Sequence, residues 1–152
     1  MKETQRISKL FKDLFEGSPW IDVNIIDSLK NISAENAAKR VLPNQNTIWE
    51  IVNHLIAWRL NVLQRVQGKV IKTPANNYFE PVKNVSPIAW NNTLRRLKES
   101  QDKWLKYLDK LKAAEMTKVY LCNKMTYYEH IQGIIQHDAY HLGQISLLRK
   151  YF

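Results

Sequence analysis

With 152 residues, of which 45% are hydrophobic and 24% charged, the chain suits one soluble globular domain spanning residues 1–152. Its single cysteine, Cys122, excludes an internal disulfide, and no stretch is apolar and long enough to cross a membrane, so we expect a cytoplasmic protein. A net charge of +9 invites a nucleic-acid partner, but basic residues occur in every segment and in 95–112 they alternate with acidic ones. We therefore interpret the charge as a solvated helix surface and disfavour nucleic acid as a partner.

The first third of the chain predicts one amphipathic helix followed by short helical turns. Apolar residues recur there at helical spacing and stop near Gly17: Ile7, Leu10, Phe11, Leu14 and Phe15. Ser18 and Pro19 then favour a helix start, which predicts a short helix through about Leu29. Ser33 is placed to cap a further turn over 34–38.

A second long helix is predicted from Thr47, because Thr47 and Glu50 form the Thr-x-x-Glu pattern of a capping box. It runs to about Gln67, where Gly68 can end it. Residues 69–85 contain two prolines and adjacent asparagines without a helical period, so we expect a loop there.

A third long helix is predicted from Ser86-Pro87 to about Leu111, with Gln101 on its apolar stripe. A glutamine in that place either marks the margin of the stripe or lines a polar cavity. Residues 113–125 form a connector.

A second Thr-x-x-Glu box, Thr126 to Glu129, opens a last helix that reaches about Tyr151 without a proline. With only four glycines and five prolines in the chain, these segments predict an all-α fold. We expect a four-helix bundle with an additional short helix after the first long one.

Three histidines on two of these helices are candidate metal ligands. His137 and His141 are four residues apart, so they lie on one face of the last helix and can present two nitrogens to one point. His54, in the middle of the second long helix, is the best candidate for a third ligand. Three neutral imidazoles suit zinc, nickel or iron and leave a position open for water or substrate, as in a catalytic site. The alternative is that all three are ordinary core or surface histidines.

The fourth histidine, His130, is on the same helix face but seven residues before His137, about 10 Å along the axis. That distance is too great to share the metal, so we expect it to line the cavity mouth or to pack. The pattern His137-Asp138-x-x-His141 is similar to the zincin motif, but aspartate is one methylene shorter than the glutamate base. Protease activity is therefore disfavoured, and Asp138 is interpreted as a group beside the ligands or on the surface.

Other residues are candidates for supporting roles. Glu50 lies one turn before His54 and either orients that ring or serves the capping box. Gln144, three residues after His141, either bonds to the histidine or backbone or packs between helices. Gly143 in mid-helix predicts the close approach of another segment. Cys122 is expected to be a small buried apolar residue and not a nucleophile.

Two motifs together resemble the DinB-like (YfiT-like) family of metal-dependent enzymes: Thr47 to Arg59 and His137 to Ile145. The resemblance extends to Gly17 to Trp20 and Ile32 to Ala38, and so covers most of the chain. It implies a four-helix bundle with a three-histidine metal site, whose ligands correspond to His54, His137 and His141.

Relatives in that family include thiol S-transferases and isomerases that use low-molecular-weight thiols such as bacillithiol or mycothiol, and many others are called hydrolases. By resemblance we expect a small-molecule substrate, such as a low-molecular-weight thiol, and a homodimer. The resulting hypothesis is an enzyme that activates water or a thiol. The alternative, from another class, is a metal-binding or nucleic-acid-binding module without activity.

Overall fold

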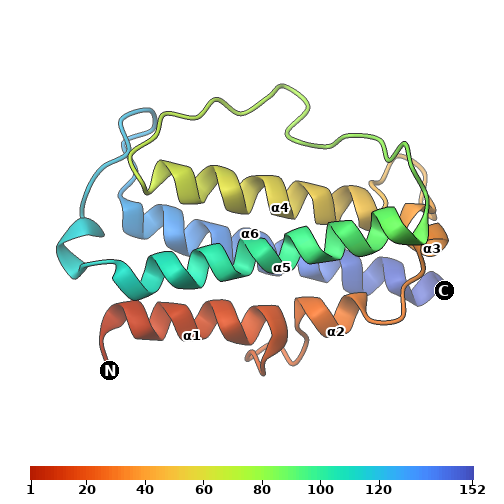
Figure 1. Ribbon diagram of the computed structural model, residues 1–152, viewed down its shortest axis with the longest axis horizontal. Helices are drawn as coiled ribbons and strands as arrows, with labels where there is room; N and C mark the ends of the chain where they lie inside the picture. Colours follow the sequence, from red (N-terminus) through yellow and green to blue (C-terminus); the bar gives the residue numbers. More distant parts are fainter.

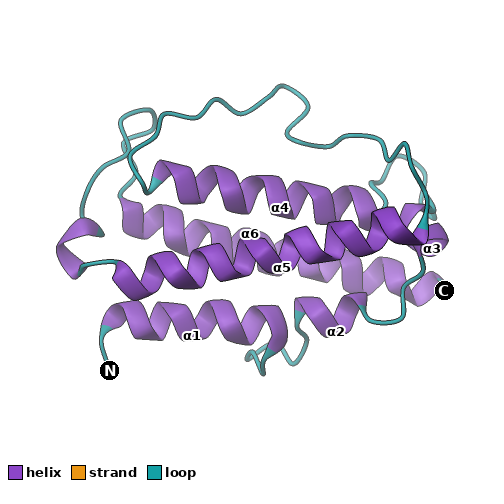
Figure 2. Ribbon diagram, viewed as in Figure 1, coloured by secondary structure: helices purple, strands orange, loops and turns teal.

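Six α-helices make up most of the computed structural model, which describes residues 1–152 (Figures 1 and 2). They are α1 (Glu3–Glu16), α2 (Ile25–Leu29), α3 (Ala34–Ala38), α4 (Ile48–Arg65), α5 (Pro87–Lys110) and α6 (Tyr127–Leu148). Two 3₁₀ turns follow α5 and α6, at Ala113–Glu115 and Arg149–Tyr151. The only β pairing is an isolated bridge between Val119 and Thr126. The fold is all-α, as predicted.

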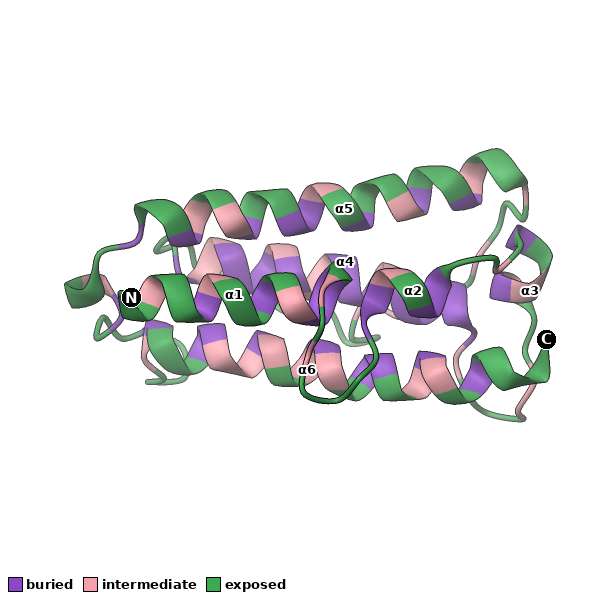
Figure 3. Ribbon diagram, turned by 90° about the horizontal axis from the view of Figure 1, so that it is seen from below, coloured by how far each residue is buried: buried purple, intermediate pink, exposed green.

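The four long helices lie side by side and enclose the core. α4 packs against both α5 and α6, and α1 packs against the same two helices from the other side (Figure 1). α4 and α6 run in opposite directions, so the middle of one lies against the middle of the other. α1, α5 and α6 each turn a buried face inward and an exposed face to solvent (Figure 3), the pattern expected of an amphipathic helix in a bundle, whereas every residue of α4 is buried or half-buried.

The core consists of two apolar clusters with a polar layer between them. One cluster has 17 buried residues and gathers α2, α3, the first half of α4 and the end of α6. The other has 13 and gathers the start of α1, the end of α4, the end of α5 and the start of α6. On the three helices α4, α5 and α6, the buried residues between these clusters are polar: Arg59, Asn61, Ser100, Gln101, Asp138 and His141. This layer places the functional groups at mid-height of the bundle.

Capping side chains fix where the long helices begin. Thr47 accepts a hydrogen bond from Glu50 N, Ser86 from Ala89 N and Thr126 from Glu129 N, so all three predicted starts are confirmed. The predicted ends differ by one to three residues: α4 is followed by a turn, α5 by the extended residue Leu111, and α6 by a 3₁₀ segment. Gly68 follows α4 with a φ of +87°, a conformation that glycine adopts without strain.

The predicted helix start at Ser18-Pro19 is wrong. Residues 18–24 form a loop with a turn at 20–22, Trp20 is 96% exposed, and α2 begins only after Asn24. The Asn24 side chain accepts from Asp27 N and donates to Gly17 O, so it caps α2 and ties the helix to the end of α1. Two short helices, α2 and α3, therefore follow α1, with Ser33 capping the second as predicted.

Gly143 also departs from its prediction. A Cβ atom placed on it would meet nothing within 4 Å, so no segment approaches there. None of the helices combines the length and the apolar character that a membrane crossing requires.

Candidate metal centre

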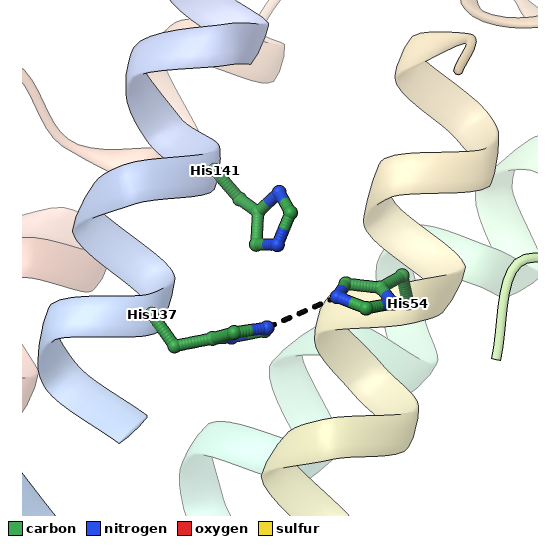
Figure 4. Close-up of side chains that lie close together, drawn as sticks. All are labelled: His54, His137 and His141. Carbon is green, nitrogen blue, oxygen red and sulfur yellow. Dashed lines mark hydrogen bonds between the residues drawn. The ribbon is translucent and has the colours of Figure 1, made fainter. Parts of the chain in front are cut away.

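The three candidate histidines converge in the middle of the bundle. His54 projects from α4, and His137 and His141 project from successive turns of α6 toward it (Figure 4). The His54 and His137 Nε2 atoms are 3.0 Å apart, and one ring nitrogen from each of the three lies within 4.8 Å of the others. Because α4 and α6 are antiparallel neighbours, residues 83 apart in sequence meet at one level.

Hydrogen bonds fix the orientation of two of the rings. His54 Nδ1 lies 2.7 Å from the carbonyl oxygen of Asn77, and His141 Nδ1 lies 2.6 Å from Gln144 Oε1. Both partners are acceptors, so each Nδ1 donates and carries the proton of the neutral ring. The Nε2 atoms of His54 and His141 therefore keep their lone pairs, as metal ligands must.

His137 lacks such a fixed partner. Its Nδ1 atom is buried without a hydrogen bond, and the nearest acceptor, Asp138 Oδ1, is 3.7 Å away and is itself unpartnered. A shift of less than 1 Å would join the two groups and complete a carboxylate–histidine pair.

Burial keeps two of the rings neutral. It lowers the pKa of His54 to about 4, although the hydrogen bond that His54 donates to Asn77 O raises the pKa, and the neighbouring His141 and His137 lower it further. Burial also lowers the pKa of His141. At neutral pH these side chains are unprotonated, so a cation does not have to displace protons from them.

The donor set and its spacing fit a divalent metal. Nitrogen ligands lie about 2.0–2.1 Å from zinc, which in a tetrahedral site puts them roughly 3.3 Å apart. The pair His54–His137 is already at 3.0 Å, and the third nitrogen lies within 4.8 Å. Because His54 carries its proton on Nδ1, this contact is a hydrogen bond in which His137 Nε2 donates to His54 Nε2, and a cation bound between the two atoms would take the place of that proton (Figure 4). The three histidines could therefore hold a metal ion.

A cavity of about 400 Å³ gives access to the histidines. Phe79 from the connection between α4 and α5 stacks on His54, with ring centroids 3.9 Å apart and planes 7° from parallel. Trp58 lies beside the same ring and donates from Nε1 to Asn77 Oδ1, which fastens the connection to α4. Tyr140 and Gln144 line the opposite side, on α6.

The supporting residues take different positions. Gln144 bonds to His141, whereas Glu50 bonds to Thr47 N and to Arg40 and makes no hydrogen bond to His54. For Glu50 the structure thus selects the capping interpretation. His130 is buried away from the cluster, edge-on to the ring of Tyr120.

Asp138 and Gln101 belong to one buried network with Arg59. The Arg59 guanidinium donates to Asp138 Oδ2 and to Gln101 Oε1, and Gln101 Nε2 donates to Phe11 O, 3.0 Å away. All three residues are at most 1% exposed. Gln101 therefore neither marks a stripe margin nor lines the cavity.

Cys122 is exposed, contrary to the expectation of a buried apolar residue. It lies in a turn, and Tyr120 N bonds to Met125 O across the base of that turn at 2.8 Å. The turn points its middle residues to solvent.

The sequence patterns did not identify the contributions of Asn77, Phe79 and Arg59. Asn77 and Phe79 lie in a segment without period, where only the general tendency of loops to border sites was available. Arg59 follows Trp58 in a quoted motif, but its burial depends on Asp138, 79 residues away.

Comparison with known proteins gives one match. The family model described as the DinB superfamily matches residues 24–145, which include α2 to α5, nearly all of α6 and all three histidines. No curated protein and no solved structure matches the chain.

Proposed function

This chain belongs to the DinB superfamily, and we propose that it is an enzyme that uses a divalent transition metal held by His54, His137 and His141. The observation that carries the proposal is the convergence of three ring nitrogens at the bottom of a cavity of about 400 Å³. A ligand group that serves only folding has no need of such a cavity, and structural zinc sites are closed by four protein ligands.

Each residue around the cluster has a distinct task in this proposal. Asn77 O and Gln144 Oε1 hold the His54 and His141 rings with Nε2 toward the common point. Phe79 covers one face of His54 and excludes water from it. When bound, the metal supplies a Lewis acid that lowers the pKa of a water or thiol ligand and polarises a substrate oxygen.

The substrate is proposed to be a small molecule that enters beside Trp58 and Tyr140. These two aromatic side chains, with Asn46, line the cavity around the histidines, and such mixed linings suit small ligands. Transfer of a low-molecular-weight thiol and hydrolysis are the two reaction classes that the family resemblance supports. Zinc, nickel and iron all suit the three imidazoles.

Elemental analysis of protein purified without a metal-affinity tag tests the metal site. We expect about one transition metal per chain in the wild type and its loss in His54→Ala, His137→Ala and His141→Ala, because two imidazoles do not close a stable site. His130→Ala is the matched control, since it removes a buried histidine of the same helix outside the cluster. Circular dichroism verifies that each variant is folded.

A second measurement separates an enzyme from a metal store. Metal-loaded protein is assayed with thiol acceptors in the presence of low-molecular-weight thiols and with ester, amide and phosphate substrates. Turnover that disappears in His137→Ala and persists in Gly143→Ala, a change at an exposed position of the same helix outside the cavity, supports the enzyme. Metal binding without turnover of any substrate would favour a non-enzymatic module, and absence of metal after incubation with zinc, nickel and iron would refute the site.

A further inference from the structure

A second cavity of about 210 Å³ adjoins the histidine cavity along the groove between α4 and α6. Trp58 and His137 line both cavities, so the two spaces meet at these side chains. The second cavity continues for one to two helical turns beyond them, past Val62 on α4 and Ile134 on α6.

The walls of this second cavity are mostly apolar. Val62 and Ile134 are core residues that form its floor, and Met125 closes one side. Gly133 contributes space, because a Cβ atom on it would meet nothing within 4 Å. Such a lining favours the hydrocarbon part of a ligand.

One cation, Arg65, stands in this apolar lining. Its guanidinium carbon lies 5.3 Å from the ring centre of Trp58 and 5.3 Å from that of Tyr120, so the group is held by two aromatic faces. Its Nη2 donates to Thr73 Oγ1 at 3.1 Å, but no carboxylate pairs with it, and its Nε is buried without an acceptor. A buried N–H without a partner is rare in proteins, and a guanidinium is shaped to bind a carboxylate.

Arg65 is the only cation in the lining of the cavity. Glu129 lines the cavity too and keeps its negative charge, but its Oε2 is held by hydrogen bonds from Thr126 N and Oγ1 at the start of α6 and no ion pair joins it to Arg65. His130 has its pKa lowered, first by burial and then by Arg65, so the ring is neutral at pH 7. The ring of His130 bonds to Asn123 Oδ1 at 3.3 Å.

We propose that this second cavity is the subsite for the carboxylate end of the substrate, with Arg65 as the residue that selects the charge. The hydrocarbon part would lie between Val62 and Ile134 and the reacting group would lie at the three histidines. A single guanidinium in an apolar pocket matches a monoanion, whereas a phosphate dianion would need further cations. The Arg65 guanidinium carbon lies 5.3 Å from the ring centre of Trp58, which is 5.9 Å from that of His137, so the guanidinium lies within about 11 Å of the His137 ring and sets the spacing between the carboxylate and the reacting group. The inference deepens the proposed function and rests on it only for the position of the reacting group.

Calorimetric titration of the full-length protein tests the subsite, with hexanoate, octanoate, phenylacetate and 4-phenylbutyrate as probes. Each acid is compared with its neutral amide. Titrations use zinc-loaded protein and protein treated with a chelator, because a carboxylate could also bind a metal directly. We expect at least one acid to bind in both preparations and more tightly than its amide. Arg65→Gln should weaken that acid about 10- to 100-fold and leave the amide unchanged.

A matched pair of glycine variants tests the space itself. Gly133→Leu should abolish binding of acid and amide alike, because the new side chain fills the cavity. Gly143→Leu adds the same side chain to the same helix at an exposed glycine that lines neither cavity, and should leave binding unchanged. The metal content of both variants should equal that of the wild type, which separates this test from the test of the histidine site.

Three results would overturn the subsite. One is that none of the acids binds the wild type. The second is equal binding by wild type and Arg65→Gln, in a variant shown by circular dichroism to be folded. The third is an affinity that vanishes with the metal and persists in Gly133→Leu, which would place the carboxylate on the metal. If the protein never binds a metal but still binds the carboxylates, only the proposed function is refuted and the subsite stands.

Discussion

The middle layer of the bundle holds two polar clusters of opposite character on the same helices. Arg59 and Asp138 each lie one residue from a side chain of the cavity, Trp58 and His137, yet they point into the core and bond to one another and to Gln101. The histidine cluster faces the cavity, and one nitrogen from each of its three rings converges on a common point. The core cluster is thus held by hydrogen bonds from Arg59 to the two other side chains and from Gln101 to the backbone of Phe11, whereas the histidine cluster opens to a cavity that a ligand can enter.

A buried ion pair next to a candidate site can therefore belong to the protein core and take no part in the chemistry of the site. The Arg59 side chain is sealed below Phe11 and Phe15, with the guanidinium carbon 5.8 and 5.3 Å from their ring centres. One atom connects the clusters: Asp138 Oδ1, 3.7 Å from His137 Nδ1. The same carboxylate can thus neutralise Arg59 and hold the third histidine.

The largest expected loss of stability comes from disrupting the core cluster of Arg59, Asp138 and Gln101. Arg59→Met leaves the Asp138 carboxylate buried without its cation, so we expect the free energy of unfolding to fall by about 3–5 kcal/mol. Urea denaturation measures it. The double variant Arg59→Met, Asp138→Leu should recover most of that loss, because apolar side chains of similar volume replace the pair. A single variant as stable as the wild type would contradict the role assigned to the ion pair.

Acidification should destabilise the protein through the histidine cluster. The pKa of His54 is lowered to about 4 in the folded protein and is about 6.5 in the unfolded chain, so between these values the unfolded chain binds more protons. Stability of the metal-free protein should therefore be complete above about pH 6.5 and decrease toward pH 4, by up to about 3 kcal/mol from this residue. Urea denaturation at pH 7, 5.5 and 4 measures the loss.

His54→Asn provides the matched variant for this pH series. It should reduce the dependence on pH without removing it, since burial also lowers the pKa values of His130 and His141. Identical slopes for His54→Asn and wild type would show that His54 titrates normally.

The smallest expected change in stability comes from a variant that should weaken metal binding alone. Gln144→Ala removes the acceptor of His141 Nδ1, which lies 2.6 Å from it, and leaves the core cluster intact. We expect zinc affinity to fall about 10- to 100-fold, as when other partners of ligating histidines are removed, with little change in the urea midpoint of metal-free protein. Competition with a fluorescent zinc chelator measures the affinity. A fall in stability equal to that of Arg59→Met would mean that the two clusters are not independent.

Local signals account for what could be predicted from the sequence. The Thr-x-x-Glu boxes at Thr47 and Thr126 involve neighbouring residues only, so they place the starts of α4 and α6 without knowledge of the fold. The i, i+4 spacing likewise puts His137 and His141 on one face. The bundle architecture then brings His54 opposite, because two long antiparallel helices meet along their length.

Contacts between distant segments account for the rest. The orientation of His54 depends on the carbonyl of Asn77, a backbone group that any residue could supply. The helix start expected at Ser18 fails because Asn24 offers a cap that also bonds to the end of α1. Neither partner can be identified from spacing, since both depend on how the chain folds back on itself.

The distance in sequence between the candidate ligands has a consequence for the order in which the molecule assembles. His54 and His137 are 83 residues apart, and α6 follows the other three long helices along the chain. Closing such a loop costs entropy that is regained only when α6 docks, so the three nitrogens come together late in folding. An ion bound by all three histidines would cross-link α4 to α6, which docks last, and would slow the separation of the two helices. Slower hydrogen exchange of α6 amides in zinc than in chelator would reveal that cross-link.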